Sequence, residues 1–466
     1  MQHGKSYFFV GIGGSGMMPL AMILAGQGAT VAGSDRSLDA GRLPAKFDDL
    51  RARGVALFPQ DGSGITSADQ IVVASAAIEA TVPDMVAAER VGAARMSRAE
   101  LLSTLFNEAA LSIGVAGTSG KSTVTGMIGW ILHAVGRDPT VMNGAVMKNF
   151  ASPDAPFASA LVGSGGVFVS EVDESDGSIA LYNPGVAVLN NVSLDHKSME
   201  ELRELFGDFL TRAEWAVVNA GDAEAAALIG LKDRDDVYTF AIEAEADYAA
   251  EALVEEPFGI AFDLASAFGR RRVRLQVPGR HNVSNALAAI AAAVAAGVPE
   301  EAAAQAIEGF VGLKRRFELV GEGGGVAVID DFGHNPDKIA ATLDTLHAFP
   351  GRLLLFFQPH GYGPLKVMRR ELVAMFAERL AAEDMLVLPD PAYFGGTTSR
   401  EVTSADIVAD VAAAGRDARH VPLRADAAEA LLAEARPGDR IVVMGARDDT
   451  LSLLAGEMVA KLRDRS

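Results

Sequence analysis

Short apolar runs alternate with longer amphipathic or Ala-rich runs along the whole chain. The apolar runs have the length and composition of buried strands: SYFFVGI, ATVAGSD, SIGVAGT, GVFVSEV and GVAVLNN. Runs with helical character, such as PLAMILAGQG, lie between them. Buried strands that alternate with helices form parallel sheets with helices on both faces. The pattern therefore predicts an α/β fold, in which residues 241–282 add hairpin strands before a helix.

The alternation restarts twice, which indicates three domains. In the first segment, QIVVASAAI at 70–78 is a further buried strand and RAELLSTLF at 98–106 is a closing helix, so a boundary is expected near residue 108. A helix and a basic linker, EEAAAQAIEGFVGLKRRF, place the second boundary near residue 317. A chain of 466 residues is too long for one ordinary core, which agrees with this division. The expected domains are 1–108, 109–317 and 318–466.

The first strand runs into a glycine-rich loop, GIGGSGMM. Gly11, Gly13 and Gly16 match the pattern G-x-G-x-x-G between a strand and a helix, and Asp35 follows the next strand. Glycines let backbone N–H groups approach a diphosphate that rests on the positive end of the helix. The loop therefore predicts a Rossmann-like first domain that binds a diphosphate, either that of NAD or that of a UDP-sugar. The alternative is a glycine-lined turn kept for packing.

A second glycine loop, GVAGTSGKST, has a stricter pattern. Gly114, Gly120, Lys121 and Ser122 complete G-x-x-x-x-G-K-S, with a strand-like run before it and a helix-like run after it. In such a P-loop, backbone N–H groups surround the β-phosphate, the lysine neutralises the β- and γ-phosphate oxygens, and the serine binds Mg²⁺. The second domain is therefore predicted to bind ATP and Mg²⁺.

Acidic residues follow a neighbouring strand. The run GGVFVS leads into a carboxylate cluster composed of Glu171, Asp173, Glu174 and Asp176. Strand alternation puts Glu171 and Asp173 on one face. The next strand ends in Asp195 and His196, and the carboxyl ends of parallel strands are where ligands bind in this architecture. The carboxylate cluster is therefore a candidate for holding a metal ion, and His196 a candidate for metal or substrate contact, the alternatives being a solvated acidic turn and a surface histidine.

Composition narrows the possible partners. The formal net charge of −20 argues against a nucleic-acid or anionic-membrane surface. The absence of cysteine excludes disulfides, thiolate metal sites and a cysteine nucleophile. The longest apolar stretch, ALAAIAAAVAAGV at 286–298, has the character of a packed helix, and a core strand at 6–10 leaves no room for a signal peptide. A soluble, cytoplasmic protein without nucleic-acid or membrane partners is expected.

The motifs occur in the order glycine loop, P-loop, EVDESDGS, NNVSLDH, GRHNVSNALAAIA, KRRF and DDFGHNP. In this order the chain resembles the Mur ligases of peptidoglycan synthesis, most of all the branches that add L-alanine to UDP-N-acetylmuramate or recycle murein tripeptide. The resemblance implies a UDP-sugar domain, a P-loop ATPase domain and a Rossmann-like C-terminal domain for an amine acceptor. It also implies an ATP-dependent amide ligase that forms an acyl phosphate and releases ADP and phosphate, as a monomer or homodimer.

Carried over by residue, the resemblance implies a set of contacts for each ligand. UDP-sugar contacts would come from Gly11, Gly13, Gly14, Ser15, Gly16, Asp35 and Ser75. ATP contacts would come from Gly117, Thr118, Ser119, Gly120, Lys121, Ser122, Thr123, Asn282, Arg316 and Asp331. The metal ligands would be Ser122, Glu171 and His196, and the catalytic residues Lys121, Glu171, His196, Arg316 and His334. Without the resemblance, KRRF is a solvated linker, DDFGHNP a turn, and Asn282 a helix cap.

The chain departs from the alanine-adding branch near the acceptor. Ser119, Phe332 and Asn335 replace a histidine, a tyrosine and a second histidine, and Gly361 stands where an arginine is usual. A guanidinium fork that grips a carboxylate is not replaced by glycine, and the nearby Lys366 offers only a point charge. An acceptor other than free L-alanine, or another sugar acid, is therefore expected. The competing hypotheses are a catalytically quiet Mur-like binding protein and an NAD(P)-dependent oxidoreductase.

Overall fold

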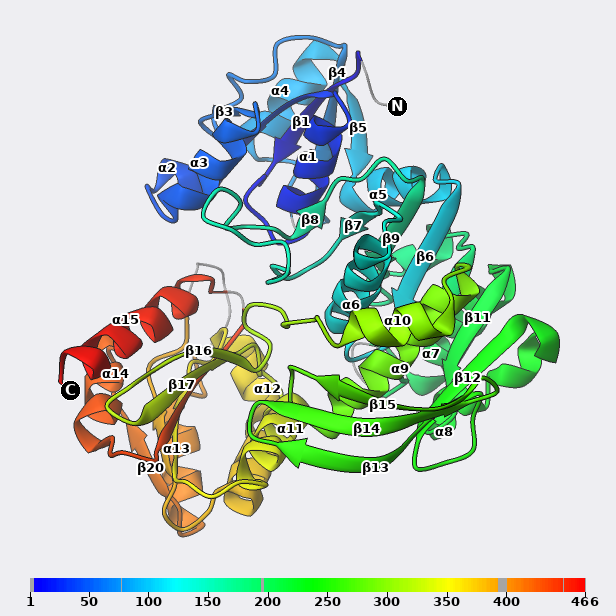
Figure 1. Cartoon of the computed structure of the whole chain (residues 1–466). Coiled ribbons are helices and arrows are strands. Elements are labelled where there is room, and N and C mark those ends of the chain that lie inside the picture. The colour runs from blue at the N-terminus through cyan, green and yellow to red at the C-terminus, as the bar shows by residue number, and fades with distance from the viewer. Residues whose placement is uncertain (1–3, 77, 194–196, 393–399, 447, 466) are drawn as a thin grey trace. The chain divides into compact units, whose positions relative to one another are not determined.

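A computed structural model describes residues 4–76, 78–193, 197–392, 400–446 and 448–465. The chain divides into two compact units, Met1–Leu313 and Lys314–Ser466. The first unit holds two sheets and the second unit holds one, and helices connect many of the strands in each sheet (Figure 1). The predicted α/β class with parallel sheets is therefore confirmed.

The first sheet has five strands, all parallel, in the order β3-β2-β1-β4-β5. Its strands are β1 (Ser6–Val10), β2 (Thr30–Ser34), β3 (Ala56–Phe58), β4 (Gln70–Ala74) and β5 (Ala94–Ser97). Its helices are α1 (Met17–Gly26), α2 (Arg36–Asp39), α3 (Pro44–Ala52), α4 (Pro83–Val91) and α5 (Arg98–Asn107). The closing helix predicted at 98–106 is thus α5. Ser97 and Glu100 form a reciprocal capping box at its start, which fixes where the helix begins.

The second sheet has ten strands in the order β15-β14-β13-β12-β11-β10-β6-β9-β7-β8. Its central strands pair in parallel, as βαβ connections require. The expected hairpins are the antiparallel strands β13, β14 and β15. The strands are β6 (Leu111–Ala116), β7 (Thr140–Met142), β8 (Ala160–Leu161), β9 (Val167–Glu171), β10 (Val186–Leu189), β11 (Trp215–Asn219), β12 (Val237–Ile242), β13 (Tyr248–Glu256), β14 (Gly259–Ser266) and β15 (Gly269–Leu275).

The helices of the second sheet are α6 (Lys121–Ala134), α7 (Met199–Arg212), α8 (Ala223–Ala226), α9 (Arg280–Ala295) and α10 (Glu300–Ile307), with short 3₁₀ turns η1 (Ser178–Leu181), η2 (Ile229–Leu231) and η3 (Arg234–Asp236). Helix α9 contains the Ala-rich stretch and is buried continuously from Asn285 to Ala293, so it is the packed helix that the sequence predicts. None of the helices in the described part of the chain is long and apolar enough to cross a membrane.

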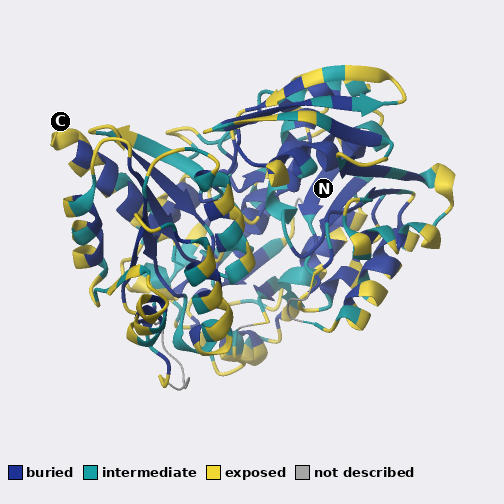
Figure 2. Cartoon of the chain, turned by 90° about the horizontal axis from the view of Figure 1, so that it is seen from below, coloured by how far each residue is buried: buried dark blue, intermediate teal, exposed yellow. Residues whose placement is uncertain are grey.

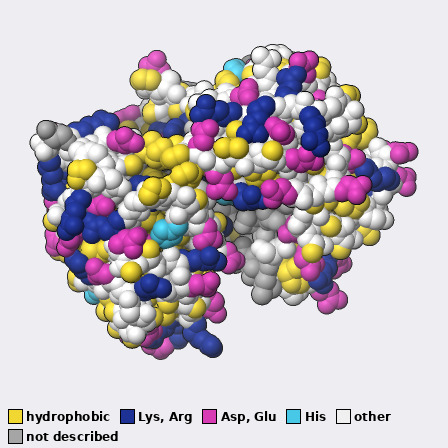
Figure 3. Space-filling view, turned by 60° about the horizontal axis from the view of Figure 1, so that its bottom comes forward, with side chains coloured by type: hydrophobic (Ala, Val, Ile, Leu, Met, Phe, Trp, Pro, Cys, Tyr) yellow, Lys and Arg dark blue, Asp and Glu magenta, His cyan; other side chains and the backbone are white. Residues whose placement is uncertain are grey.

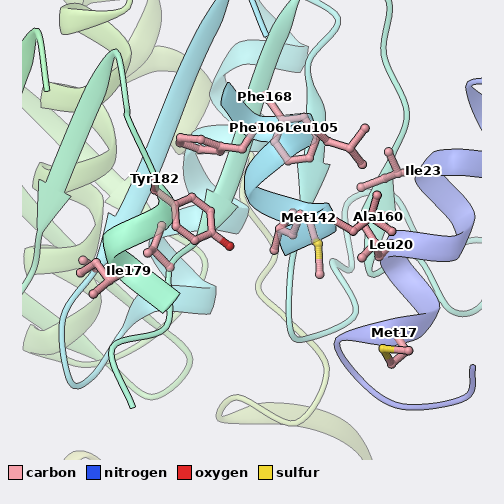
Figure 4. Packing of buried hydrophobic residues seen from close by; sticks show 14 of the residues in the cluster. Met17, Leu20, Ile23, Leu105, Phe106, Met142, Ala160, Phe168, Ile179 and Tyr182 are labelled. Carbon is pink, nitrogen blue, oxygen red and sulfur yellow. The ribbon is translucent and has the colours of Figure 1, made fainter. Parts of the chain in front are cut away.

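One hydrophobic core is shared by the first sheet and the second. Helix α1 contributes Met17, Leu20 and Ile23, and strands β7 and β8 contribute Met142 and Ala160 to the same cluster. Figure 4 shows Leu20 and Ile23 facing Ala160. At Gly26, near the end of α1, an added β-carbon would lie 2.9 Å from a methyl group of Val162, which shows how closely helix and sheet approach. The first two sheets are therefore packed together within one unit.

The second unit contains a six-stranded sheet in the order β16-β17-β21-β18-β19-β20, parallel except for the β16–β17 pair. Its strands are β16 (Glu318–Gly323), β17 (Val326–Asp331), β18 (Leu353–Phe357), β19 (Met385–Leu388), β20 (Asp417–His420) and β21 (Arg440–Met444). Its helices are α11 (Pro336–His347), α12 (Tyr362–Arg379), α13 (Ser404–Ala413), α14 (Arg424–Glu434) and α15 (Thr450–Asp464). Strands β17, β18 and β21 are buried along their whole length, as central parallel strands are.

Buried and exposed residues follow this layering. Figure 2 shows buried positions along the strands and exposed positions on the outward faces of the helices. On the face drawn in Figure 3, acidic and basic side chains are intermingled with hydrophobic ones. The charge on that face is therefore dispersed rather than gathered in one wide patch of a single sign.

Candidate functional site

The first glycine loop connects β1 to α1 at the carboxyl edge of the first sheet. Gly11 has a φ of +78°, and the N–H of Gly13 donates to Asp35 Oδ2 over 2.8 Å. Asp35 also caps α2 by accepting from the Ser37 N–H. A β-carbon at Gly13 would lie 2.9 Å from Asp35 Oδ2 and 3.0 Å from the Phe47 ring, so this glycine is needed for packing inside the protein.

The other residues predicted for the first loop lie at the same edge. Gly14 and Ser15 are exposed, Gly16 is the N-cap of α1, and Ser75 directly follows β4, the neighbour of β1. Strand order β2-β1-β4 brings Asp35, the loop and Ser75 together, since parallel strands end at one edge. The structure therefore assembles the seven residues that the sequence predicts for a UDP-sugar into one place.

The P-loop connects β6 to α6 and has the expected form. Gly117 and Gly120 have φ values of +130° and +83°, where only glycine is comfortable. A β-carbon at Gly120 would lie 2.3 Å from Asn190 Nδ2 and 2.6 Å from Asn285 Oδ1. The loop backbone is therefore held against two asparagine side chains, which leave no room for a larger residue.

Lys121, at the start of α6, is held by the protein itself. Its Nζ donates to Gly117 O over 2.7 Å and to the two carboxylate oxygens of Glu174 over 2.9 and 3.2 Å. Glu174 is only 4% exposed. The interpretation of the acidic cluster as a solvated turn is therefore wrong for Glu174, which is a buried partner of the P-loop lysine.

Ser122 and Glu171 form a second contact at this edge. Ser122 Oγ donates to Glu171 Oε2 over 2.8 Å. Strand β9 ends at Glu171, so Asp173 lies beyond the strand. The prediction that strand alternation puts Glu171 and Asp173 on one face is therefore wrong. Burial would raise the pKa of Asp173, but hydrogen bonds from Ser175 and the charges of Lys121 and Arg98 outweigh it and lower the pKa.

The structure describes only part of the predicted metal site. Asp195 and His196 lie outside the described residues, whereas Ser122 and Glu171 are in contact. Among the described residues, no three His, Cys, Asp or Glu side chains are grouped as metal ligands. The serine hydroxyl and the carboxylate are both hard oxygen donors of the kind that Mg²⁺ prefers, so the two residues in view fit such an ion.

Three asparagines that the sequence analysis did not select, Asn190, Asn191 and Asn285, contact the P-loop or each other beside it. Asn191 Oδ1 accepts from the Ser119 N–H over 2.8 Å and from Thr118 Oγ1 over 2.9 Å. Asn190 Nδ2 donates to Ser119 O and to Asn285 Oδ1, both over 3.0 Å. The signal was present in the sequence, because two polar amides directly follow the buried run GVAVL.

Asn282 lies at the end of this amide chain. It accepts a hydrogen bond from Asn285 Nδ2 over 3.2 Å and donates to Pro278 O over 2.7 Å. Helix α9 begins at Arg280 with Gly279 as its N-cap, so the interpretation of Asn282 as the helix cap is wrong. Asn282 is a buried residue of the first helical turn, connected through Asn285 and Asn190 to the P-loop.

In the second unit, the KRRF segment is not a solvated linker. Arg315 is 7% exposed, lies 3.4 Å from Asp330 and donates to Gly445 O over 2.7 Å. The Arg316 guanidinium lies 4.2 Å from the centroid of the Phe332 ring. Burial raises the pKa of Asp330 to about 6 even though Arg315 favours its charged form.

Asp331 and His334 follow β17. Asp331 Oδ1 accepts from the Phe317 N–H over 2.9 Å, and Oδ2 accepts from the Gly333 N–H over 3.0 Å and from Thr342 Oγ1 over 2.9 Å. His334 Nδ1 lies 2.9 Å from Phe332 O, and burial lowers the pKa of His334 to about 3. His334 is therefore a neutral imidazole at ordinary pH.

The departures from the alanine-adding branch also have structural explanations. Asn335 caps α11 by accepting from the Lys338 N–H over 2.9 Å, so the turn predicted for DDFGHNP is a helix start. Gly361 is the N-cap of α12 and has a φ of +139°, a conformation that favours glycine. Lys366, the nearby cation that could have substituted for the missing arginine, is ion-paired with Glu401.

Comparisons with known proteins cover nearly the whole chain. Three family models match in order: "Mur ligase family, catalytic domain" at residues 6–109, "Mur ligase middle domain" at 115–293 and "Mur ligase, glutamate ligase domain" at 315–447. A protein of Cereibacter sphaeroides named UDP-N-acetylmuramate–L-alanine ligase is 35% identical over 472 residues, which cover 98% of this chain and 97% of that protein. A protein of the same name from Acidithiobacillus ferrooxidans is 36% identical over 461 residues, 95% of each chain.

Solved structures agree in fold. UDP-N-acetylmuramate-alanine ligase MurC of Thermotoga maritima has a TM-score of 0.79 at 24% identity, and the match covers 99% of this chain and 100% of that one. A murein peptide ligase of Psychrobacter arcticus has a TM-score of 0.72 at 23% identity and covers 99% of each chain. The family models, the curated relatives and the P-loop geometry point the same way. The chain therefore belongs to the Mur ligase family, and it is an ATP-dependent ligase.

Proposed function

We propose that this ligase joins an amino acid to the carboxylate of UDP-N-acetylmuramate, at the expense of ATP, in the cytoplasm. The observation that carries the proposal is the arrangement of the first unit, in which a diphosphate-type glycine loop and a P-loop with carboxylate partners belong to one packed body. The names of relatives at 35% and 36% identity over nearly the whole chain support the choice of substrate.

The reaction brings two anions together. A carboxylate oxygen of the sugar acid attacks the γ-phosphorus of ATP, ADP leaves, and an acyl phosphate forms. The amino group of the acceptor then attacks the acyl carbon, phosphate leaves, and the amine proton goes to solvent or a base. Because the carboxylate and the γ-phosphate repel each other, the site needs fixed positive charge, and we assign this role to Lys121, whose Nζ lies at the P-loop backbone.

Glu174 sets a condition on ATP binding. In the structure its carboxylate accepts hydrogen bonds from the Nζ of Lys121, the same group that a γ-phosphate would bind. ATP must therefore displace Glu174 from Lys121 when it binds, and the exchange replaces a buried carboxylate by phosphate oxygens. The asparagines around Ser119 and Gly120 keep the loop backbone in place during this exchange.

Magnesium would be held by Ser122 and Glu171, with His196 as the further ligand that the resemblance implies. The ion supplies neutralisation of phosphate charge when it is bound. Glu171→Gln should raise the magnesium concentration needed for half-maximal phosphate release by roughly tenfold, because a neutral amide is the weaker ligand. A magnesium titration at saturating ATP measures this, and unchanged dependence would remove Glu171 from the metal site.

For the second unit we propose that Arg316 and Asp331 contact ATP and that His334 acts in the reaction as a neutral group. The acceptor cannot be gripped by a guanidinium at position 361, since glycine stands there. The acceptor carboxylate must therefore be bound by other groups, which makes the acceptor the part of the reaction to be measured first.

The deciding experiment is a phosphate-release screen. UDP-N-acetylmuramate and ATP are incubated with L-alanine, glycine, L-serine or murein tripeptide, and products are identified by mass. Release that depends on one amine, with the matching amide product, supports the proposal. Binding of both nucleotides without release for any amine would identify a quiet binding protein, and NADH binding seen by its fluorescence would favour an oxidoreductase. Size-exclusion chromatography distinguishes a monomer from a homodimer.

A further inference from the structure

Arg98 lies against the first glycine loop, although it belongs to the helix that closes the first sheet. A β-carbon built on Gly16 would be 3.1 Å from Arg98 Cδ and 3.5 Å from both Nε and Nη1. The capping box of Ser97 and Glu100 fixes Arg98 as the first residue of α5. Its side chain is therefore directed along the loop at the point where α1 begins.

The Arg98 guanidinium has unused donors. It makes no hydrogen bond to another residue in the described part of the chain, and its ion-pair partner Asp176 lies 3.8 Å away, beyond hydrogen-bond distance. The side chain is 22% exposed, so the head group is accessible yet partly desolvated. A guanidinium with free donors can bind a carboxylate or a phosphate without first breaking a strong hydrogen bond.

The loop needs such a cation. Asp35 already places a carboxylate on the Gly13 N–H, and a nucleotide diphosphate brings further negative charge to the same backbone. The chain as a whole carries a net charge of −20, which repels anions. The N-terminus of α1 has no side-chain cap and no acidic residue in its first turn, so its N–H groups favour an anion but cannot neutralise it.

We propose that Arg98 binds the diphosphate of the UDP-sugar at the first glycine loop, releasing Asp176 as the substrate enters. The inference rests on the proposed function, because it assumes that this loop takes a UDP-sugar. A guanidinium can donate two parallel hydrogen bonds to phosphate oxygens, and such charge-assisted pairs are stronger than neutral ones. Arg98 is then a substrate-binding residue for the activated sugar.

The exchange also connects the two glycine loops. Asp176 lies in the carboxylate cluster whose Glu174 holds Lys121 of the P-loop. When the diphosphate takes Arg98, Asp176 loses its cation, and the segment 171–176 is less strongly tethered to the first sheet. The diphosphate therefore takes a cation that lies next to the residues that ATP must rearrange, but the ion pair it breaks is weak and partly exposed, so its loss should leave ATP binding nearly unchanged.

The test measures equilibrium binding of UDP-N-acetylmuramate and of ATP separately, by isothermal titration calorimetry at low salt. Arg98→Met should weaken UDP-N-acetylmuramate binding by roughly tenfold to a hundredfold and UDP binding similarly. ATP binding should change by less than about twofold. Asp176→Asn should tighten UDP-N-acetylmuramate binding by up to about fivefold, because it removes the competing carboxylate of a weak, partly exposed pair.

Arg95→Met is the matched control. Arg95 lies three residues earlier in the same segment, is 39% exposed and pairs with Glu89, so its loss changes the charge equally without touching the loop. The dissociation constant of the Arg95→Met variant for UDP-N-acetylmuramate should stay within about twofold of that of wild type. Arg98→Lys, which keeps the charge but not the fork, should give an intermediate affinity and remains informative if Arg98→Met fails to fold.

Two results would overturn the inference. If Arg98→Met and Asp176→Asn both weaken ATP binding and leave UDP-N-acetylmuramate binding unchanged, Arg98 only anchors the acidic segment. If wild type binds UDP-N-acetylmuramate and Arg98→Met binds it equally well, the inference fails while the proposed function stands. If wild type itself does not bind the sugar nucleotide, the proposed function fails first, and the assignment of Arg98 fails with it.

Discussion

The Nζ of Lys121 lies 2.9 Å from Oε2 of Glu174, and this carboxylate is buried. The P-loop lysine therefore already has an anionic partner inside the protein. The pair gives the lysine a defined position before nucleotide arrives, and it makes ATP binding a competition between two anions for one ammonium group.

Replacement of Lys121 by alanine tests the separation of the two loops. Phosphate release should fall by at least about a hundredfold, because the fixed charge near the transferred phosphoryl group is lost. The affinity for UDP-N-acetylmuramate should remain close to that of wild type, since its proposed loop is a separate one. Phosphate release and calorimetric binding are measured on the same preparation, and an equal loss of both would argue against two separate sites.

Glu174→Gln should tighten ATP binding, by roughly fivefold, because the γ-phosphate then displaces a neutral amide instead of a carboxylate. The dissociation constant for ATP without the sugar substrate is the quantity to measure. Glu200→Gln, an exposed change in the first turn of α7, is the control for loss of one negative charge. Weaker ATP binding in Glu174→Gln would mean that the carboxylate positions Lys121 for ATP and does not compete with it.

Gly361→Ala should lower the free energy of unfolding of the second unit by about 1 kcal/mol or more, because its φ of +139° is strained for any residue with a β-carbon. The cost is conformational, since the added carbon would meet only Pro364 Cδ at 3.6 Å. Gly456→Ala in α15 is the control: this glycine has open space and an ordinary helical position, so the change should be neutral or stabilising. Denaturant unfolding measures both, and equal stability of the two variants would contradict the strain at 361.

The lowered pKa of buried His334 predicts that the stability of the second unit depends on pH. Its pKa is lowered to about 3 in the folded protein, against 6.5 ordinarily, so the unfolded chain takes up a proton first as the pH falls. The contribution of neutral His334 to the free energy of unfolding is fully present above about pH 6.5 and is lost progressively between pH 6.5 and pH 3. Relative to His334→Gln, wild type should lose roughly 1 kcal/mol between pH 7.5 and 5.5. Denaturant titrations at the two values check this, and parallel pH profiles would contradict a neutral His334.

Much of the fold could be predicted because strands and loops carry local signals. Continuous apolar runs such as residues 6–10 and 186–189 are buried parallel strands, and the Gly-Lys-Ser sequence fixes the P-loop by its own backbone requirements. Hairpin strands were also expected at residues 241–282, where β13 to β15 lie, although alternation is weak in this Ala-rich stretch.

What the sequence did not predict depends on contacts between distant residues. Glu174 pairs with Lys121, which lies far from it along the chain, and Asn190 reaches Asn285 on a different helix. Arg315 looks like a surface residue in a basic run, yet it is buried because Gly445 and Asp330 satisfy its guanidinium. No local pattern reports such partners. The signal for Arg98 was equally hidden, because its approach to Gly16 requires β1 and β5 to share a sheet.

The core that helix α1 shares with strands β7 and β8 has a consequence for making parts of this enzyme. A fragment ending near Asn107 would leave Leu20 and Ile23 in contact with water, because the surfaces that cover them are missing. Such a truncated piece would be prone to aggregate, and heat or urea should melt the two nucleotide loops in a single transition rather than one after the other.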